Sequence, residues 1–168
     1  MTTSPRSRAC SAARTRMRCF AIAAALLLPF LASAQSADGI VNIATPQTLS
    51  VKRGQTATQT LDISLRSGFH VNSDKPKDEF LIPIKLTWMS GPLAAKQITY
   101  PKPEDVKVGE DTLSVFTGKF TIETKFLAPP QAQAGIATMQ GKLRYQACDS
   151  RSCKRPATVE VKVPVSIQ

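Results

Sequence analysis

The stretch Thr60-Leu61-Asp62-Ile63-Ser64-Leu65 alternates polar and apolar residues with a period of two. The same alternation recurs in Lys119-Phe120-Thr121-Ile122-Glu123 and in Thr158-Val159-Glu160-Val161-Lys162-Val163. Successive side chains of a β-strand point to opposite faces of the sheet, so this period is typical of strands with one buried and one wet face. These three stretches therefore predict antiparallel β-structure.

Further short segments with strand character lie between turn signals. They are Thr48–Lys52, Phe69–Asn72, Ile82–Trp88, Gln97–Tyr100, Leu113–Phe116 and Thr138–Ala147. Glycine and proline separate them, and no window has the period of a long amphipathic helix. Eight or nine short strands at this spacing predict an all-β fold, an immunoglobulin-like antiparallel β-sandwich. Trp88 is interpreted as a core residue of that sandwich, with a ligand platform as the alternative.

The first 34 residues have the pattern of a secretory signal peptide. They contain five arginines and no acidic residue, and an apolar run from Phe20 to Leu31 precedes the small residues Ala32-Ser33-Ala34. This pattern places cleavage before Gln35. A retained anchor is the alternative, but the apolar run is short for a membrane span. Met17 opens a compact version of the same signal and is an alternative start. We expect export, most simply to a bacterial periplasm.

Beyond the signal peptide we expect a flexible lead-in at residues 35–46, which are small and polar, and one domain at residues 47–168. The 168-residue chain has 22 basic and 12 acidic residues and a net charge of +10, and loss of the five leader arginines lowers this to +5. The remaining basic residues are spread singly and few aromatics accompany them, which argues against nucleic-acid binding. Hydrolase chemistry has no support, because no Gly-x-Ser-x-Gly motif is present.

Cys148 and Cys153 are the only cysteines outside the signal peptide. The polar loop Asp149–Ser152 separates them, so we expect Cys148 to end one strand and Cys153 to begin the next. Residues opposite each other in an antiparallel pair have Cα atoms about 4.5–5.5 Å apart, within the range that a disulfide requires. On the chain-entropy model, closing so short a loop contributes only about 2 kcal/mol, which makes the bond a weak staple.

Three interpretations of the cysteine pair stay open at this point. A structural disulfide is common in an exported protein. Thiol–disulfide exchange is favoured by a polar hairpin tip, where both sulfurs are expected to be accessible. The charges of Arg151, Lys154 and Arg155 stabilise a thiolate, although Asp149 opposes them. Metal binding fits poorly, because a closed zinc site needs four ligands and the chain offers two cysteines and one histidine. We expect no metal and no cofactor.

The residues around this pair resemble a known family. Lys142-Leu143-Arg144-Tyr145-Gln146-Ala147-Cys148, a polar loop and Cys153-Lys154-Arg155-Pro156 are similar to the N-terminal periplasmic domain of the thiol:disulfide interchange reductase DsbD. Stretches that follow the same order as in that family are Gly68–Asn72, Leu81–Trp88, Tyr100–Pro103 and Leu113–Gly118. The resemblance covers nearly all of the mature chain and implies an immunoglobulin-like sandwich.

The resemblance also implies roles for the cysteines. Cys153 would form the mixed disulfide with a partner and Cys148 would resolve it. The family shields its cysteines with an aromatic-bearing cap loop, but the matching region, Val106–Leu113, has no aromatic residue. His70 falls on the strand bordering the cysteines, where it could tune a thiolate or assist proton transfer. The alternative for His70 is a strand residue that merely packs or faces solvent.

We therefore predict a periplasmic thiol–disulfide interchange protein that relays reducing equivalents through Cys148 and Cys153. The implied partners are thioredoxin-like periplasmic proteins. Family members continue into transmembrane helices and a thioredoxin-like domain, whereas this sequence ends at Gln168, so the expected electron source is a separate membrane-embedded reductase. The alternative is a secreted, non-catalytic interaction module with a structural hairpin disulfide. A third possibility is an accessory subunit of a membrane-bound reductase.

Overall fold

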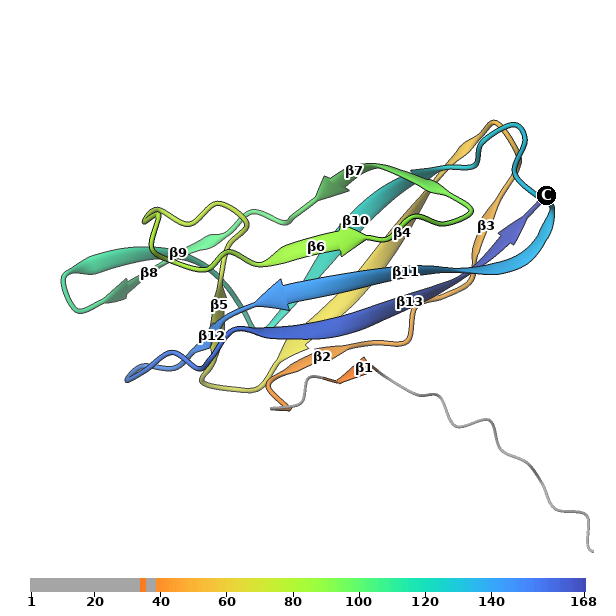
Figure 1. Cartoon of the computed structure of the whole chain (residues 1–168). Coiled ribbons are helices and arrows are strands. Elements are labelled where there is room, and N and C mark those ends of the chain that lie inside the picture. Colours follow the sequence, from red (N-terminus) through yellow and green to blue (C-terminus); the bar gives the residue numbers. More distant parts are fainter. Residues whose placement is uncertain (1–33, 36–38) are drawn as a thin grey trace, which may run out of the picture. The chain divides into compact units, whose positions relative to one another are not determined.

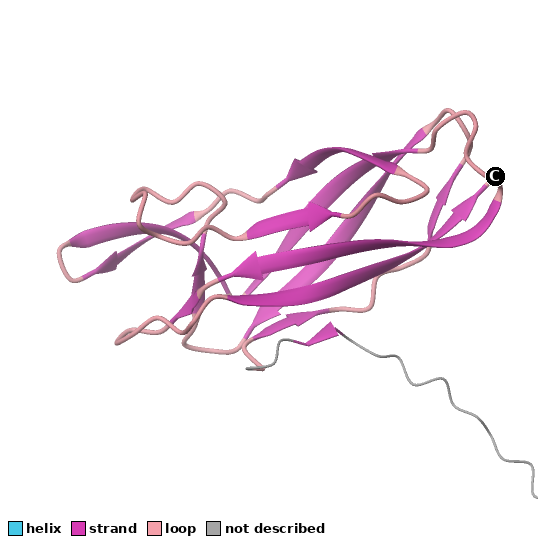
Figure 2. Ribbon diagram, viewed as in Figure 1, coloured by secondary structure: helices cyan, strands magenta, loops and turns pink. Residues whose placement is uncertain are grey.

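The computed structural model describes residues 34–35 and 39–168. The predicted signal peptide lies outside these residues except for Ala34. Every regular element in the described part is a β-strand (Figure 2). The strands are β1 (Ala34–Gln35), β2 (Val41–Ile43), β3 (Leu49–Val51), β4 (Thr56–Leu65), β5 (His70–Asn72), β6 (Lys85–Trp88), β7 (Ala94–Thr99), β8 (Glu104–Val108), β9 (Asp111–Thr117), β10 (Lys119–Leu127), β11 (Gly135–Tyr145), β12 (Ala147–Cys148) and β13 (Ala157–Ile167). None of the described residues forms a helix that could span a membrane.

Two sheets form a sandwich, with strand orders β1-β2-β4-β10-β7 and β3-β13-β11-β6 (Figure 1). The long strands β4, β10, β11 and β13 bury every second residue over most of their length, because their apolar residues recur with a period of two. The side chains that point inward from both sheets belong to one hydrophobic core. The prediction of an all-β, immunoglobulin-like sandwich is confirmed.

One strand departs from the antiparallel arrangement. β3 runs parallel to β13, with Leu49 opposite Val165 and Val51 opposite Ile167. The strands before and after it, β2 and β4, belong to the other sheet. The chain therefore crosses from one sheet to the other to reach β3 and crosses back to reach β4.

The segment expected as a flexible lead-in carries part of the core. β2 pairs with β4 through Val41–Leu65 and Ile43–Ile63, and both β2 residues are buried, as is Ile40. Three residues are too short a run for the period of two to stand out among small polar neighbours. The packed domain therefore begins before residue 47.

The region corresponding to the family's cap loop is mostly a β-hairpin. β8 and β9 pair antiparallel and turn at Gly109-Glu110 between the paired residues Val108 and Asp111. Gly109 has φ of +65°, the left-handed conformation that tight hairpin turns use at this position. β8 was not predicted as a strand, because only Val106 of its five residues is partly buried and the strand therefore has no alternation of apolar and polar residues.

β6 begins at Lys85, later than the predicted start at Ile82. Pro83 has no backbone N–H to donate to a sheet ladder, which explains the later start. The preceding residues contact β5 instead: the Ile82 carbonyl accepts a hydrogen bond from Asn72 Nδ2 (3.0 Å), and Ile84 N donates to the Asn72 carbonyl (3.3 Å).

Trp88 closes one side of the core, as interpreted from the sequence. Its indole Nε1 donates to Thr124 Oγ1 at 3.0 Å, and its ring meets Phe126 edge-on with centroids 4.9 Å apart. Gly141 lies directly opposite on β11. A Cβ atom there would lie 2.8 Å from Trp88 Cε3, so only glycine leaves room for the indole.

A third sheet, of order β12-β5-β9-β8, lies at one end of the sandwich (Figure 1). Its strands continue those of the two main sheets. Gln146 alone separates β11 from β12, Gly118 alone separates β9 from β10, and residues 66–69 separate β4 from β5. Strands of both main sheets thus continue into one small sheet. This small sheet positions the candidate site.

Candidate functional site

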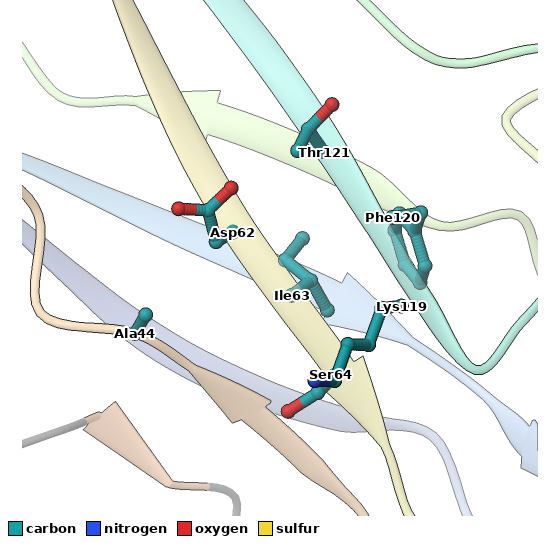
Figure 3. A pocket seen from close by; sticks show the side chains of 7 residues that line it. All are labelled: Ala44, Asp62, Ile63, Ser64, Lys119, Phe120 and Thr121. Carbon is teal, nitrogen blue, oxygen red and sulfur yellow. The ribbon is translucent and has the colours of Figure 1, made fainter.

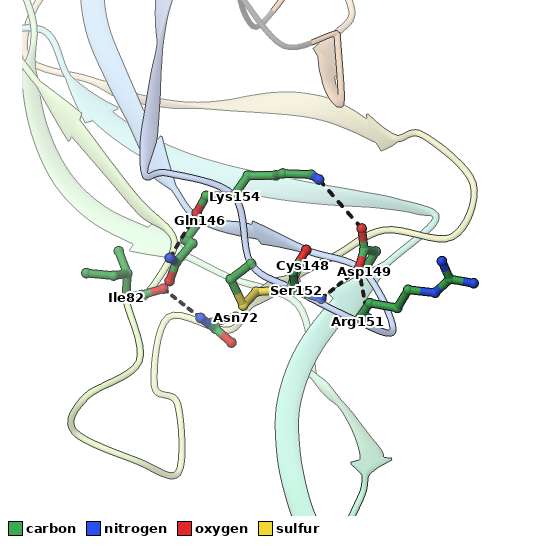
Figure 4. The surroundings of a disulfide bond; sticks show 9 residues. Asn72, Ile82, Gln146, Cys148, Asp149, Arg151, Ser152 and Lys154 are labelled. Atoms are coloured by element: carbon green, nitrogen blue, oxygen red, sulfur yellow. Dashed lines mark hydrogen bonds and ion pairs between the residues drawn. A yellow bond between two sulfur atoms is a disulfide. The ribbon is translucent and has the colours of Figure 1, made fainter.

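Cys148 and Cys153 form a disulfide at the edge of the third sheet (Figure 4). Cys148 ends β12, as predicted. Cys153 lies opposite it in an isolated antiparallel bridge, and the next strand, β13, begins only at Ala157. Their Cα atoms are 4.0 Å apart, slightly closer than expected.

The loop between the two cysteines is a compact turn organised by Asp149. Its backbone N donates to the Ser152 carbonyl at 2.9 Å, and its Oδ1 accepts from the N–H groups of Arg151 and Ser152, both at 2.8 Å (Figure 4). These backbone hydrogen bonds lower the pKa of the Asp149 carboxyl, and the charge of Lys154 adds to the effect. The carboxylate is thus held ionised at the tip of the hairpin.

Further bonds fix both strands of this hairpin. Lys154 N donates to the Ala147 carbonyl at 2.8 Å, and Gln146 Nε2 donates to the Lys154 carbonyl at 3.0 Å. The Lys154 ammonium lies 3.7 Å from Asp149 Oδ2. These interactions therefore hold the backbone of the hairpin that carries the two cysteines.

The two sulfur-bearing residues differ in exposure. Cys153 is exposed, whereas Cys148 is only 3% exposed. The expectation that both sulfurs are accessible is correct for Cys153 and wrong for Cys148. The reason is the position of β12, which lies between β5 on one side and Cys153 on the other. Cys153 is therefore the more accessible end of the bond.

His70 is the cross-strand neighbour of the buried cysteine. It pairs with Cys148 on β12 and with Thr117 on β9. His70 as a residue is 9% exposed, and Nε2 of its ring has no hydrogen-bond partner. Burial lowers the pKa of His70, and the negative charge of Asp149 partly offsets this. The ring is therefore largely neutral at neutral pH.

The basic residues identified from the sequence flank Cys153 along the chain. Arg151, Lys154 and Arg155 are all exposed. Lys154 Nζ also lies 5.9 Å from the centroid of the Phe69 ring, and the Arg66 guanidinium lies 4.7 Å from it. Phe69 and Arg66 are not among the site residues predicted from the sequence, since their only signal is their closeness along the chain to His70.

A pocket of about 360 Å³ adjoins His70. It is lined by Arg66, Ser67, Gly68, Phe69, His70, Val106, Thr117 and Gly118. The pocket thus lies between the 66–69 turn and the β8–β9 hairpin, on the side of His70 away from β12.

A second pocket of about 360 Å³ lies over β4 and β10 (Figure 3). Its lining includes Asp62, Ser64, Lys119 and Thr121, which pair across these strands. None of its residues belongs to the surroundings of the disulfide. Among the described residues no group of three histidine, cysteine, aspartate or glutamate side chains could hold a metal ion.

A solved structure with a similar fold is the N-terminal periplasmic domain of ScsB from Proteus mirabilis. The two chains are 11% identical with a TM-score of 0.56, over 81% of this chain and 50% of that one. This chain therefore spans about half the length of that structure, and at this identity the likeness shows the fold alone. The seventh ScaB type I cohesin from Pseudobacteroides cellulosolvens aligns at 11% identity over 77% of this chain and 92% of its own, with a TM-score of 0.43, too low to indicate a shared fold.

The family is identified from the sequence. No curated protein matches it. Residues 41–164 match the family model described as thiol:disulfide interchange protein DsbD, N-terminal. The match includes β4, β10, β11 and most of β13, the third sheet and both bonded cysteines. The chain belongs to the family of DsbD N-terminal domains.

Proposed function

We propose that this domain carries out thiol–disulfide interchange through Cys148 and Cys153 and relays reducing equivalents between redox proteins. The observation that carries the proposal is the asymmetry of the bond: one sulfur-bearing residue is exposed on a hairpin tip and the other is buried. Family membership supports the same chemistry. The short loop also supports it, because a bond that closes four intervening residues contributes little as a staple.

In the receiving step, a thiolate of a reduced donor attacks Cys153 Sγ. A new sulfur–sulfur bond forms to the donor, and Cys148 Sγ leaves with the electron pair. The donor's second thiol then attacks its own bonded sulfur and releases Cys153. Two electrons have moved, the donor has become a disulfide, and the domain holds two thiols. No cofactor takes part.

In the delivering step, the Cys153 thiolate attacks the disulfide of an acceptor and forms a mixed disulfide. Cys148 then attacks Cys153 Sγ, the acceptor leaves reduced, and the original bond is restored. The exposed cationic side chains of Arg151, Lys154 and Arg155 favour the Cys153 thiolate. The exposed cysteine thus meets partners, and the buried one resolves the adduct.

The proposed location is the periplasm, supported by the pattern of residues 1–34 and by the family. The proposed partners are thioredoxin-like proteins that receive electrons and a separate membrane-embedded reductase that donates them. The alternative, a secreted interaction module with a permanent disulfide, makes the opposite prediction for every trapping experiment.

The test is adduct trapping with an oxidised thioredoxin-like protein. A Cys148→Ala variant should accumulate a mixed disulfide through Cys153, and the matched Cys153→Ala variant should accumulate none. The pair should also have a reduction potential above about −300 mV, because structural disulfides lie below that value. If Cys148→Ala forms no adduct and the potential is lower, the bond is structural.

A further inference from the structure

Four residues lie in one row across the third sheet. Cys153 is opposite Cys148, Cys148 is opposite His70, and His70 is opposite Thr117. Directly opposed residues in antiparallel strands place their side chains on the same face, with Cβ atoms about 4.5–5.5 Å apart. The row therefore sets His70 next to Cys148, on the side away from Cys153.

The imidazole has an unused acceptor. His70 is 91% buried, and its Nε2 has no hydrogen-bond partner. Buried polar atoms nearly always have a partner, so an exception needs an explanation. In this structure Cys148 Sγ is bonded to Cys153 and carries no proton to donate. Reduction would give Cys148 an S–H group directly opposite the ring.

We propose that His70 is the proton acceptor for Cys148 when Cys148 resolves a mixed disulfide. The inference rests on the exchange chemistry proposed above. The Cys148 thiol gives its proton to Nε2 of the neutral imidazole, and the resulting thiolate attacks Cys153 Sγ. The bond between Cys148 and Cys153 forms, and the partner sulfur leaves with the electron pair. In the receiving step the departing Cys148 thiolate takes up a proton from water.

The buried position of Cys148 explains why a dedicated acceptor is needed. A thiolate is disfavoured in apolar surroundings, so Cys148 does not ionise readily by itself. The cationic side chains that favour ionisation are exposed and flank Cys153 instead. The cationic residues favour ionisation of the Cys153 thiol. A neutral base in the same cross-strand row would favour ionisation of the Cys148 thiol by accepting its proton.

The protonation state of His70 agrees with this role. Burial lowers the pKa of the ring, which leaves it unprotonated and able to accept. Of the neighbouring charges, Asp149 raises that pKa by a smaller amount. Arg66 lines the same pocket, Lys154 and Arg66 share the Phe69 ring, and Glu104 accepts a hydrogen bond from Thr117 at 2.9 Å. Substitutions that change any of these charged groups could themselves alter the pKa of His70, so the experiment must leave these groups unchanged.

The kinetic experiment uses the full-length chain with Cys10→Ser and Cys19→Ser, so that only the site pair reacts. The reduced protein is mixed with dithiobis(nitrobenzoate), an aromatic disulfide whose released thiolate is coloured. Attack by Cys153 releases the first coloured thiolate, and resolution by Cys148 releases the second. The two phases therefore report the two cysteines separately.

His70→Gln should slow the second phase about 100-fold at pH 7 and leave the first within two-fold of the parent, which is the usual scale of general-base catalysis. The parent's second phase should slow as pH falls through the His70 pKa, below 6.5, and the variant should lack that inflection. Thr117→Val, on the other side of His70 in the same row, should leave both phases unchanged. An identical second phase in the parent and His70→Gln would overturn the role of His70.

A second measurement needs no substitution at the site. His70 is the only histidine in the chain, so its imidazole signals in a proton NMR titration are unambiguous. A hydrogen bond accepted from the Cys148 thiol stabilises the neutral ring, so the pKa of His70 should be lower in the reduced protein than in the oxidised one. An equal pKa in both states would refute the inference.

The two proposals fail in different ways. If the parent shows no second phase, or the trapping experiment yields no adduct, the exchange function itself is wrong. If adducts form and resolve normally without His70, only the proton-acceptor role is wrong.

Discussion

The long strands of the sandwich and the short strands of the third sheet bury different kinds of side chain. β4, β10, β11 and β13 have 9 to 11 residues each, and their inner face is almost entirely apolar. The third sheet has strands of two to seven residues, and its buried residues include His70, Asn72 and Ser114. Both His70 and Asn72 retain a buried polar atom without a hydrogen bond.

The two regions therefore contribute to different properties, the large sheets to stability and the small sheet to the proposed chemistry. Apolar burial is the dominant favourable contribution to folding, and it is concentrated between the two large sheets. Buried polar atoms without partners cost free energy, and two of the three such side-chain atoms among the described residues, His70 Nε2 and Asn72 Oδ1, lie in the third sheet, while Asn42 Oδ1 lies on β2. The sandwich therefore supplies the stability that allows the small sheet to hold reactive and imperfectly paired groups.

The largest expected effect is on stability alone. Phe126→Ala removes a fully buried ring that packs against Trp88 and should lower the free energy of unfolding by about 3–5 kcal/mol. Under conditions where the variant stays folded, its disulfide should react with dithiothreitol at the parent's rate. Urea unfolding and thiol release measure the two quantities. Phe80→Ala, at a site that is 85% exposed, is the control and should change stability by less than about 0.5 kcal/mol. A large change in disulfide reactivity in Phe126→Ala would show that the disulfide site depends on the packing of the sandwich core.

The next effect comes from overpacking the same core. In Gly141→Ala the new methyl group would lie 2.8 Å from Trp88 Cε3 and 3.1 Å from the Thr87 carbonyl oxygen. The neighbours must shift, so the variant should lose about 1–3 kcal/mol. Thermal or urea unfolding measures the loss. Gln140→Ala, at an exposed residue next to it on β11, should be nearly neutral. Equal stability of the two variants would contradict the close contact between β11 and the indole.

Reduction of the disulfide should have a smaller effect than Phe126→Ala, about 2 kcal/mol at most, because the loop that the bond closes is short. The reduced domain should keep its β-sheet circular dichroism spectrum and unfold cooperatively. Urea unfolding with and without dithiothreitol gives the difference, and the Cys153→Ala variant should match the reduced parent. A reduced domain that unfolds outright would show that the small sheet, and not the sandwich, holds the fold together.

The smallest effect is the pH dependence caused by His70. Its pKa is lower in the folded protein than the unfolded value of 6.5, so the unfolded state binds more protons between the two values. Stability from this group is complete above pH 6.5 and is lost as pH falls toward the folded pKa. The urea midpoint of the parent should therefore decrease on going from pH 7 to pH 5.5.

His70→Gln is the control for this window and should lack the decrease. The carboxyl of Asp149 acts at lower pH, because hydrogen bonds depress its pKa below 3.8. Its contribution is therefore lost in a separate, more acidic range. A parent midpoint that does not change between pH 7 and pH 5.5 would contradict the burial of a neutral imidazole.

Much of the sandwich follows from local pattern. The alternation in residues 60–65, 119–123 and 158–163 predicted three of the four long strands, and all three extend beyond the predicted stretch. Prediction failed where the pattern was short or missing. β2 buries only a few residues, and β8 is mostly exposed on both faces, so neither strand has a period that the sequence could reveal.

The sequence by itself determined the alternating strands, the two closely spaced cysteines and the polar loop between them, because these depend on neighbours along the chain. Only the tertiary structure decided that Cys148 is buried, that Cys153 is exposed and that His70 lies opposite Cys148. Burial and cross-strand pairing depend on which distant segments lie alongside each other. The chain brings residues 70 and 148 together only by turning strands of both main sheets into a third sheet.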